Sequence, residues 1–191
     1  IRAAGKSGRD FDILILHGRA IDPETRHDAV CSVGIRGGKI AAISSDELRG
    51  STTFEARDQV VCPGFIDPMA HGQDLDNDRL QVRDGVTTTL QMEAGVEDVP
   101  AWYAAQEGRR LVNYGAGTSH VWARKVILGA GAEEGIASDA QIARMAAFMS
   151  ANLAAGGLGV GFGLEYQPGS TRWEVLETFR VAGEVKASCH V

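Results

Sequence analysis

Between residues 11 and 61, short apolar stretches alternate with glycine, proline and polar residues at the spacing typical of β-strands. Strands are predicted at residues 12–16, 31–36, 39–43 and 52–56. Gly37 and Gly38 separate two of these strands and suit a two-residue hairpin turn. Because this run of strands precedes any helical pattern, it predicts a small β-sandwich domain over residues 11–62. Residues 1–10 are basic and rich in small side chains, and we expect them to form a disordered tail.

After residue 63 the pattern changes, because predicted strands now alternate with helical periodicity. Strands are predicted at residues 64–71, 86–93, 111–118, 158–164 and 186–191. Alternating strands and helices are typical of βα units around a parallel sheet. The predicted fold class is therefore α/β, with residues 63–191 forming a partial TIM barrel of about five βα units.

Three helices between these strands have recognisable starts. Asp98 is a predicted N-cap, and Pro100 follows it in the first turn. Ser138 and Thr171 each open a capping-box pattern, with Gln141 and Glu174 three residues further on. These signals predict helices from about residue 98 to 110, from 138 to 155 and from 171 to 183.

Five barrel strands leave a sheet edge unpaired, since a complete eight-fold barrel takes about 250 residues. An open apolar edge promotes aggregation. Either the chain is a fragment, or the edge is covered by a partner or by a second copy in a homo-oligomer.

Composition and charge narrow the class of protein. The 191 residues are 44% apolar and 23% charged, which is ordinary for a globular protein, and the net charge is −6. This charge argues against nucleic acid or an anionic membrane as the main partner. No apolar run approaches the ~20 residues that a membrane span needs. The wide spacing of Cys31, Cys62 and Cys189 fits reduced, buried thiols in a cytoplasmic protein.

Candidate chemistry is concentrated at the first predicted barrel strand. If residues 64–71 form one strand, Asp67, Met69 and His71 project from the same face. A histidine at the carboxyl end of a parallel strand is well placed to offer a metal ligand at the mouth of a barrel.

Gly64-Phe65-Ile66-Asp67-Pro68-Met69-Ala70-His71 resembles the first barrel strand of the metal-dependent amidohydrolase superfamily, whose motif reads Gly-Phe-Ile-Asp-x-His-x-His. The stretch from Gly163 to Gly169 resembles the Gly-Leu-x-Tyr-x-Pro-Gly loop of its D-aminoacylase (N-acyl-D-amino-acid deacylase) branch. The resemblance covers nearly all of this chain but only the N-terminal portion of a family member. Met69 replaces the first motif histidine, and its thioether suits Cu(I) better than zinc.

The resemblance implies a hydrolase that cleaves C–N amide bonds in a small-molecule substrate, with one or two divalent metal ions, zinc by expectation, that polarise the carbonyl and activate water. It implies that His71 and His190 are metal ligands, although a histidine on an apolar strand is also compatible with a core residue. Glu93 stands near the place of a metal-binding cysteine in the D-aminoacylase branch. It is either a third ligand or a solvated charge at the rim. In the family, later strands supply another metal-binding histidine and the aspartate that acts as general base.

Three further residues are candidates for contact with substrate. Tyr166 is either a hydrogen-bond donor to a substrate carboxylate or carbonyl, or a half-buried aromatic residue. Glu165 is either close to the metal or a rim charge, and His120 ends the third strand, where it could touch substrate. The alternative function is a catalytically inactive relative that acts as a binding or structural module, which Met69 and the short chain favour.

Overall fold

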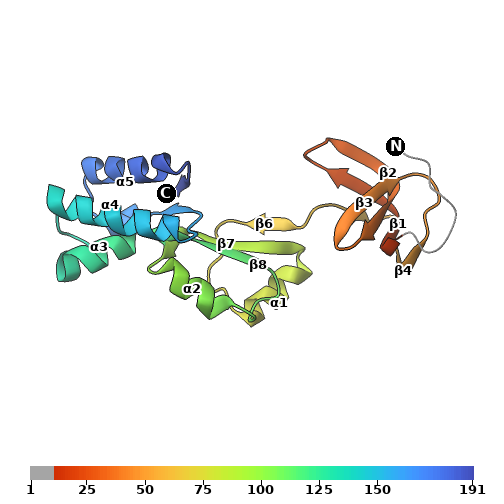
Figure 1. The fold of residues 1–191 in the computed structure, drawn as a ribbon, viewed down its shortest axis with the longest axis horizontal. Helices are drawn as coiled ribbons and strands as arrows, with labels where there is room; N and C mark the ends of the chain where they lie inside the picture. Colours follow the sequence, from red (N-terminus) through yellow and green to blue (C-terminus); the bar gives the residue numbers. More distant parts are fainter. Residues whose placement is uncertain (1–10) are drawn as a thin grey trace. The chain divides into compact units, whose positions relative to one another are not determined.

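A computed structural model of the chain describes residues 11–191, so the predicted tail at residues 1–10 lies outside the described part. The chain divides into two compact units, Ile1–Pro63 and Gly64–Val191. Figure 1 shows that each unit has its own sheet, the first in orange and the second in yellow to blue.

The N-terminal unit is built on one mixed sheet. Its strands are β1 (Phe11–Asp22), β2 (His27–Arg36), β3 (Lys39–Ser44), β4 (Gly50–Glu55) and β5 (Val60–Val61). They lie in the order β3-β2-β1-β4, with β5 also paired to β1. β2 is antiparallel to β1 and β3, whereas β4 and β5 are parallel to β1. Because the described strands form a single sheet, the predicted two-layer sandwich is not confirmed.

Two local features set the path of this sheet. Gly37 and Gly38 have φ angles of +59° and +72°, as a hairpin turn with two left-handed residues requires, so the predicted turn is confirmed. β1 is longer than predicted, because a register irregularity between Ile15 and Gly18 lets pairing with β2 resume. His17, inside that irregularity, has a φ of +58°.

The core of the N-terminal unit is small. Ala20, Cys31 and Val33 form its buried cluster. The cysteines of the chain are all free thiols, as predicted, but they are not all buried. Cys62 is exposed and Cys189 is partly buried, so the expectation of three buried thiols is wrong for these two.

The C-terminal unit contains a five-stranded parallel sheet. Its strands are β6 (Phe65–Asp67), β7 (Val86–Val96), β8 (Asn113–Ser119), β9 (Gly159–Gly161) and β10 (Ser188–His190). Their spatial order, β6 to β10, is the order of the chain. Each strand is parallel to its neighbours and is connected to the next one by at least one helix, as in the βα units of a TIM barrel. The predicted α/β class is confirmed.

Five α-helices and two short 3₁₀ turns connect these strands. They are α1 (Leu75–Arg83), α2 (Val99–Gln106), α3 (His120–Leu128), η1 (Gly129–Gly131), α4 (Asp139–Ala154), η2 (Leu164–Tyr166) and α5 (Arg172–Glu184). Asp98 caps α2, and Ser138 forms the predicted capping box with Gln141. Thr171 caps α5, but Glu174 does not complete a box there. Among these helices, none is both long and apolar enough to cross a membrane.

The main core of the unit lies between α4, α5 and the sheet. Figure 1 shows α4 and α5 side by side, and they are in contact. The predicted stripe of Ile142, Met145 and Met149 is buried and packs in one cluster with Val160 and Phe162. This core supports the carboxyl ends of β8 and β9, where candidate residues gather.

Candidate active site

The first barrel strand is shorter than predicted. β6 ends at Asp67, Pro68 begins a turn, and Met69 makes only an isolated bridge to Gln91. The predicted single strand to residue 71 is therefore wrong, because the turn interrupts its alternation. His71 follows the strand at its carboxyl end, which is the end at which the sequence predicted it.

His71 and Glu93 meet at this end of the sheet. The Nε2 atom of His71 lies 3.0 Å from Oε2 of Glu93, although the residues are 22 positions apart. β6 and β7 are parallel neighbours, so their carboxyl ends reach the same edge. Both side chains remain accessible, with 59% and 40% of their surface exposed. The pair can therefore contact a ligand without any rearrangement of the core.

Glycines allow the strand that carries Glu93 to approach its neighbours closely. A Cβ atom on Gly161 of β9 would collide with the backbone carbonyl of Glu93 and would lie 2.5 Å from the carbonyl oxygen of Met92. Gly95 has a φ of +63°, a left-handed conformation that favours glycine. The position of Glu93 thus depends on backbone contacts that a larger residue would prevent.

A cavity of about 740 Å³ opens beside the pair. Its wall includes His71, Glu93, Trp122, Lys125, Glu165 and Tyr166. Glu165 and Tyr166 come from η2, in the loop that follows β9. Trp122 and Lys125 come from α3. The structure thus brings four of the six predicted site residues, His71, Glu93, Glu165 and Tyr166, to one cavity.

Tyr166 presents its phenol to this cavity with its proton retained. A hydrogen bond to Glu165 and the charge of that carboxylate raise the pKa of Tyr166, and the charge of Glu93 acts in the same direction. The side chain is 69% exposed, so it is accessible to a ligand. A protonated phenol can donate a hydrogen bond to a carbonyl or carboxylate oxygen.

His120 lies beneath the cavity wall rather than on it. It is the first residue of α3 and is fully buried. Its Nε2 atom is 2.7 Å from Oε1 of Glu174, and its ring stacks on Phe162 with the centroids 5.0 Å apart. Phe162 lines the cavity, whereas His120 packs against the Phe162 ring and is not part of the cavity wall.

A buried ion pair beside His120 was missed by the sequence analysis. Arg124 and Glu174 are both fully buried, and Nη1 of Arg124 lies 2.6 Å from each carboxylate oxygen. Burial acts to raise the pKa of Glu174, but hydrogen bonds from His120 and Arg124 outweigh it, so this pKa is lowered. The spacing of His120 and Arg124, one helical turn apart, was an available signal, but no helix was predicted there.

His190 is placed differently from the other predicted ligands. It ends β10, at the opposite edge of the sheet order from β6. Its Nε2 atom lies 2.8 Å from Oγ of Ser188, on the same face of the strand. Within residues 11–191, no group of three or more His, Cys, Asp and Glu side chains is close enough together to hold a metal ion.

Comparisons with known proteins point to one superfamily, although no family model matches the chain. The dihydroorotase of Streptococcus pneumoniae serotype 4 is 34% identical over 91 residues, which are 43% of this chain and 22% of that protein. The D-aminoacylase of Alcaligenes xylosoxydans xylosoxydans is 33% identical over 102 residues, 49% of this chain and 20% of that protein. The matched part therefore spans about a fifth of each curated relative.

The solved structure of N-acyl-D-glutamate deacylase from Bordetella bronchiseptica, in complex with zinc and a phosphonate inhibitor, extends this likeness to most of the chain. It superposes with a TM-score of 0.79 at 25% identity, covering 94% of this chain and 44% of that one. This chain resembles the amidohydrolases. Within that superfamily, the resemblance is to the D-aminoacylase branch, as the motifs predicted.

The donors of this amidohydrolase-like chain fit a zinc site only in part. The imidazole of His71 and the carboxylate of Glu93 are ligand types that zinc accepts. A catalytic zinc ion takes three protein ligands, however, and Met69 offers a thioether where the superfamily motif has an imidazole. The described residues therefore do not fit a complete zinc site by themselves.

Proposed function

We propose that this chain forms part of a metal-dependent hydrolase of C–N amide bonds that acts on N-acyl-D-amino acids or closely similar substrates. The observation that carries the proposal is the His71–Glu93 pair, 3.0 Å apart at the carboxyl-end edge of a parallel sheet and facing a cavity. This is the end of a barrel sheet at which active sites are built. The relatives named D-aminoacylase, dihydroorotase and N-acyl-D-glutamate deacylase support the same reaction class.

The proposed metal is a divalent ion, zinc by preference, since the solved deacylase is in complex with zinc. His71 and Glu93 are the proposed ligands, with His190 as a further candidate from β10. Their oxygen and nitrogen donors suit zinc better than soft copper(I).

The cavity supports a small acylated amino acid as substrate. Its volume of about 740 Å³ falls within the range of about 300–1,000 Å³ that is usual for small-molecule sites. Tyr166, whose hydrogen bond to Glu165 raises its pKa, has one phenolic proton, which it would donate to the amide carbonyl or the carboxylate of the substrate in exchange for that bond. Lys125, which lies 4.8 Å above the Trp122 ring, gives the same wall a positive charge.

The proposal is tested with the purified chain by two measurements, zinc affinity in competition with a chromogenic chelator and hydrolysis of N-acetyl-D-amino acids against their L-enantiomers. We expect His71→Ala to weaken zinc binding and to abolish hydrolysis. His17→Ala is the control, because His17 also pairs with a glutamate but belongs to the N-terminal unit. Equal zinc binding by wild type and His71→Ala would contradict the proposal.

A second candidate function is a catalytically inactive relative that serves as a binding or structural module. Met69, 55% exposed in place of a motif histidine, specifically favours it. The distinguishing experiment is Met69→His, followed by the same zinc and hydrolysis assays. If the chain is a catalytically inactive module, the wild type hydrolyses none of the substrates and Met69→His binds zinc more tightly than the wild type. Hydrolysis by the wild type would rule this reading out.

A further inference from the structure

We propose that Asn77 is the positioning residue that sets the direction of His71, by holding the backbone of the loop from which the imidazole projects. The inference deepens the proposed hydrolase function, on which its catalytic meaning rests, and it concerns a residue outside the cavity wall. The hydrogen bonds by which Asn77 holds this loop do not require a bound metal or a substrate.

The loop that carries His71 has little regular structure of its own. It connects the isolated bridge at Met69 to the start of α1, and no strand includes it. On one side, the amide of Ala70 donates to the carbonyl of Leu90 on β7, at 3.1 Å. Gly72, directly after the histidine, has a φ of +59°. The direction of His71 therefore depends on what holds the other side of this loop.

Asn77 provides that second attachment. Its side-chain amide donates to the carbonyl oxygen of His71 at 2.9 Å and to that of Gly72 at 3.0 Å. The His71 side chain is 59% exposed and makes a polar contact with Glu93. Apart from this contact with Glu93, the position of the ring depends on the backbone that Asn77 holds.

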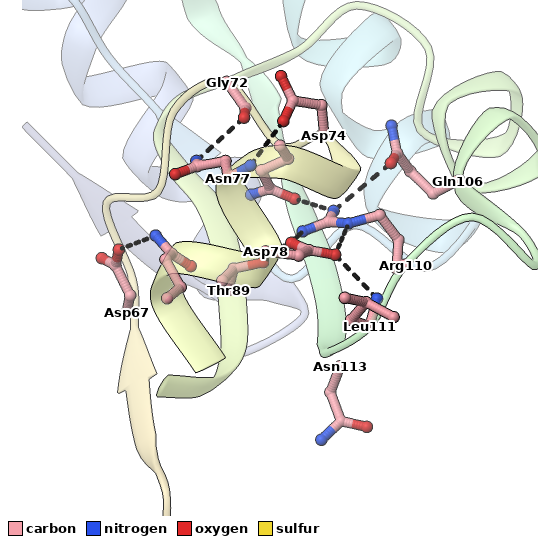
Figure 2. Close-up of polar contacts among 12 residues, drawn as sticks. Asp67, Gly72, Asp74, Asn77, Asp78, Thr89, Gln106, Arg110, Leu111 and Asn113 are labelled. Atoms are coloured by element: carbon pink, nitrogen blue, oxygen red, sulfur yellow. Dashed lines mark hydrogen bonds and ion pairs between the residues drawn. The ribbon is translucent and has the colours of Figure 1, made fainter. Parts of the chain in front are cut away.

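Asn77 is itself held rigidly through its neighbour Asp78. The carboxylate of Asp78 is buried and receives hydrogen bonds from Nε of Arg110 at 2.8 Å and from the amide of Leu111 at 2.9 Å. Arg110 also donates to Oγ1 of Thr89 on β7, at 2.9 Å. Figure 2 shows this ion pair beside α1, with Asn77 reaching from the same helix toward Gly72. The sheet, the buried ion pair and the loop are therefore connected through α1.

The role of Asn77 is separate from the stability of the helix start. Asp74 caps α1 by accepting a hydrogen bond from the backbone amide of Asn77 at 2.8 Å, and this bond does not need the Asn77 side chain. Substituting Asn77 therefore leaves the cap and the Asp78–Arg110 pair intact. Asn77→Ala removes only the two bonds to the loop, whereas Asn77→Asp also brings a negative charge to the two carbonyl oxygens.

The test uses the metal-free chain and two variants, Asn77→Ala and the nearly isosteric Asn77→Asp, which retains the size of the side chain but has no amide donor. The readouts are the ring ¹H–¹⁵N signals of His71 by NMR and the rate at which diethyl pyrocarbonate modifies each histidine, measured by mass spectrometry. His17 is the internal reference, since it pairs with Glu55 at 3.0 Å and is 48% exposed. Asn113→Ala is the matched control, because Asn113 donates to the carbonyl of Thr87 at 3.1 Å and points away from the loop (Figure 2).

We expect both Asn77 variants to shift the His71 ring signals and to raise its modification rate roughly two- to tenfold, which corresponds to losing a hydrogen bond of about 0.5–1.5 kcal/mol. His17 should react at the wild-type rate, and Asn113→Ala should change neither histidine. Unchanged His71 signals and rates in both variants would overturn the inference, and so would an equal rise in Asn113→Ala. Absence of hydrolase activity in the wild type would affect only the proposed function, because neither readout involves catalysis.

Discussion

The imidazole of His71 and the carboxylate of Glu93 face each other at 3.0 Å across two parallel strands, at a place where neither is buried. An exposed pair of this kind adds only about 0–1 kcal/mol to stability. Stability therefore gives little reason for its presence, whereas the adjoining cavity gives it access to a ligand.

The first prediction concerns this pair. Glu93→Gln keeps the shape of the side chain but removes its charge, so zinc affinity should fall clearly in a chelator competition titration. Urea unfolding should change by no more than about 1 kcal/mol. Glu133→Gln is the control, since Glu133 lines the same cavity. Identical zinc affinities for Glu93→Gln and wild type would show that Glu93 is a rim charge.

The second prediction concerns the buried pair of Arg124 and Glu174. Arg124→Met leaves the Glu174 carboxylate in the interior with only His120 as a side-chain partner, which should cost about 3–5 kcal/mol of unfolding free energy. The measurement is urea denaturation followed by tryptophan fluorescence.

The comparison for that substitution is Arg180→Met on the neighbouring helix α5. Arg180 pairs with Glu177 at 2.6 Å, but its side chain is 59% exposed. Its loss should cost no more than about 1 kcal/mol. Similar losses in the two variants would mean that the interior pair contributes no more than a surface one.

The third prediction concerns acid stability. Hydrogen bonding by Arg110 lowers the pKa of Asp78 below its ordinary value of 3.8. A carboxylate with a lowered folded-state pKa contributes stability that is complete above the ordinary value and is lost as the pH falls through the folded-state pKa. Asp78→Asn should therefore be much less stable than wild type at neutral pH, and the difference should shrink below about pH 3.8.

Unfolding free energies measured along a pH series check this prediction. Asp76→Asn is the matched variant, because Asp76 pairs with Arg79 on the same helix but is 88% exposed. Its difference from wild type should stay small at every pH. A gap between Asp78→Asn and wild type that is constant across the acidic range would contradict the assigned role of Asp78.

Local chemistry explains which elements the sequence could predict. The Gly37-Gly38 turn, the Asp98 cap and the Ser138 capping box each depend on residues within a few positions, and each is confirmed. The alternation of strands and helices after residue 63 likewise predicted the parallel sheet in its observed order.

Tertiary partners explain what the sequence did not predict. α1 is a polar helix, and it is held by the pairing of Asp78 with Arg110, 32 residues away. Glu174 matched a capping box, but the buried Arg124, 50 residues away, takes its carboxylate instead. The meeting of His71 and Glu93 followed from adjacent parallel strands, whereas His190, on β10, forms no metal-binding group with them within residues 11–191.

The fourth prediction concerns Gly161. Gly161→Ala would place a Cβ against the backbone carbonyl of Glu93, which cannot move aside as a flexible side chain could. We expect a loss of roughly 1–3 kcal/mol by urea unfolding, together with shifted His71 ring signals. Gly183→Ala, in α5 with no atom near the added Cβ, should instead be neutral or stabilising by up to about 1 kcal/mol. Equal stabilities for the two variants would mean that β7 and β9 are not closely packed there.

The contact at Gly161 also shows that different parts of the chain position Glu93 and shape the walls of the cavity. Close backbone contacts between β7 and β9 fix the position of Glu93. Trp122 and Tyr166, which form part of the cavity wall, come instead from the helix α3 and the short 3₁₀ turn η2. A protein engineer could therefore exchange Trp122 and Tyr166 to change which molecules the cavity admits, while the backbone contacts of Glu93 stay the same.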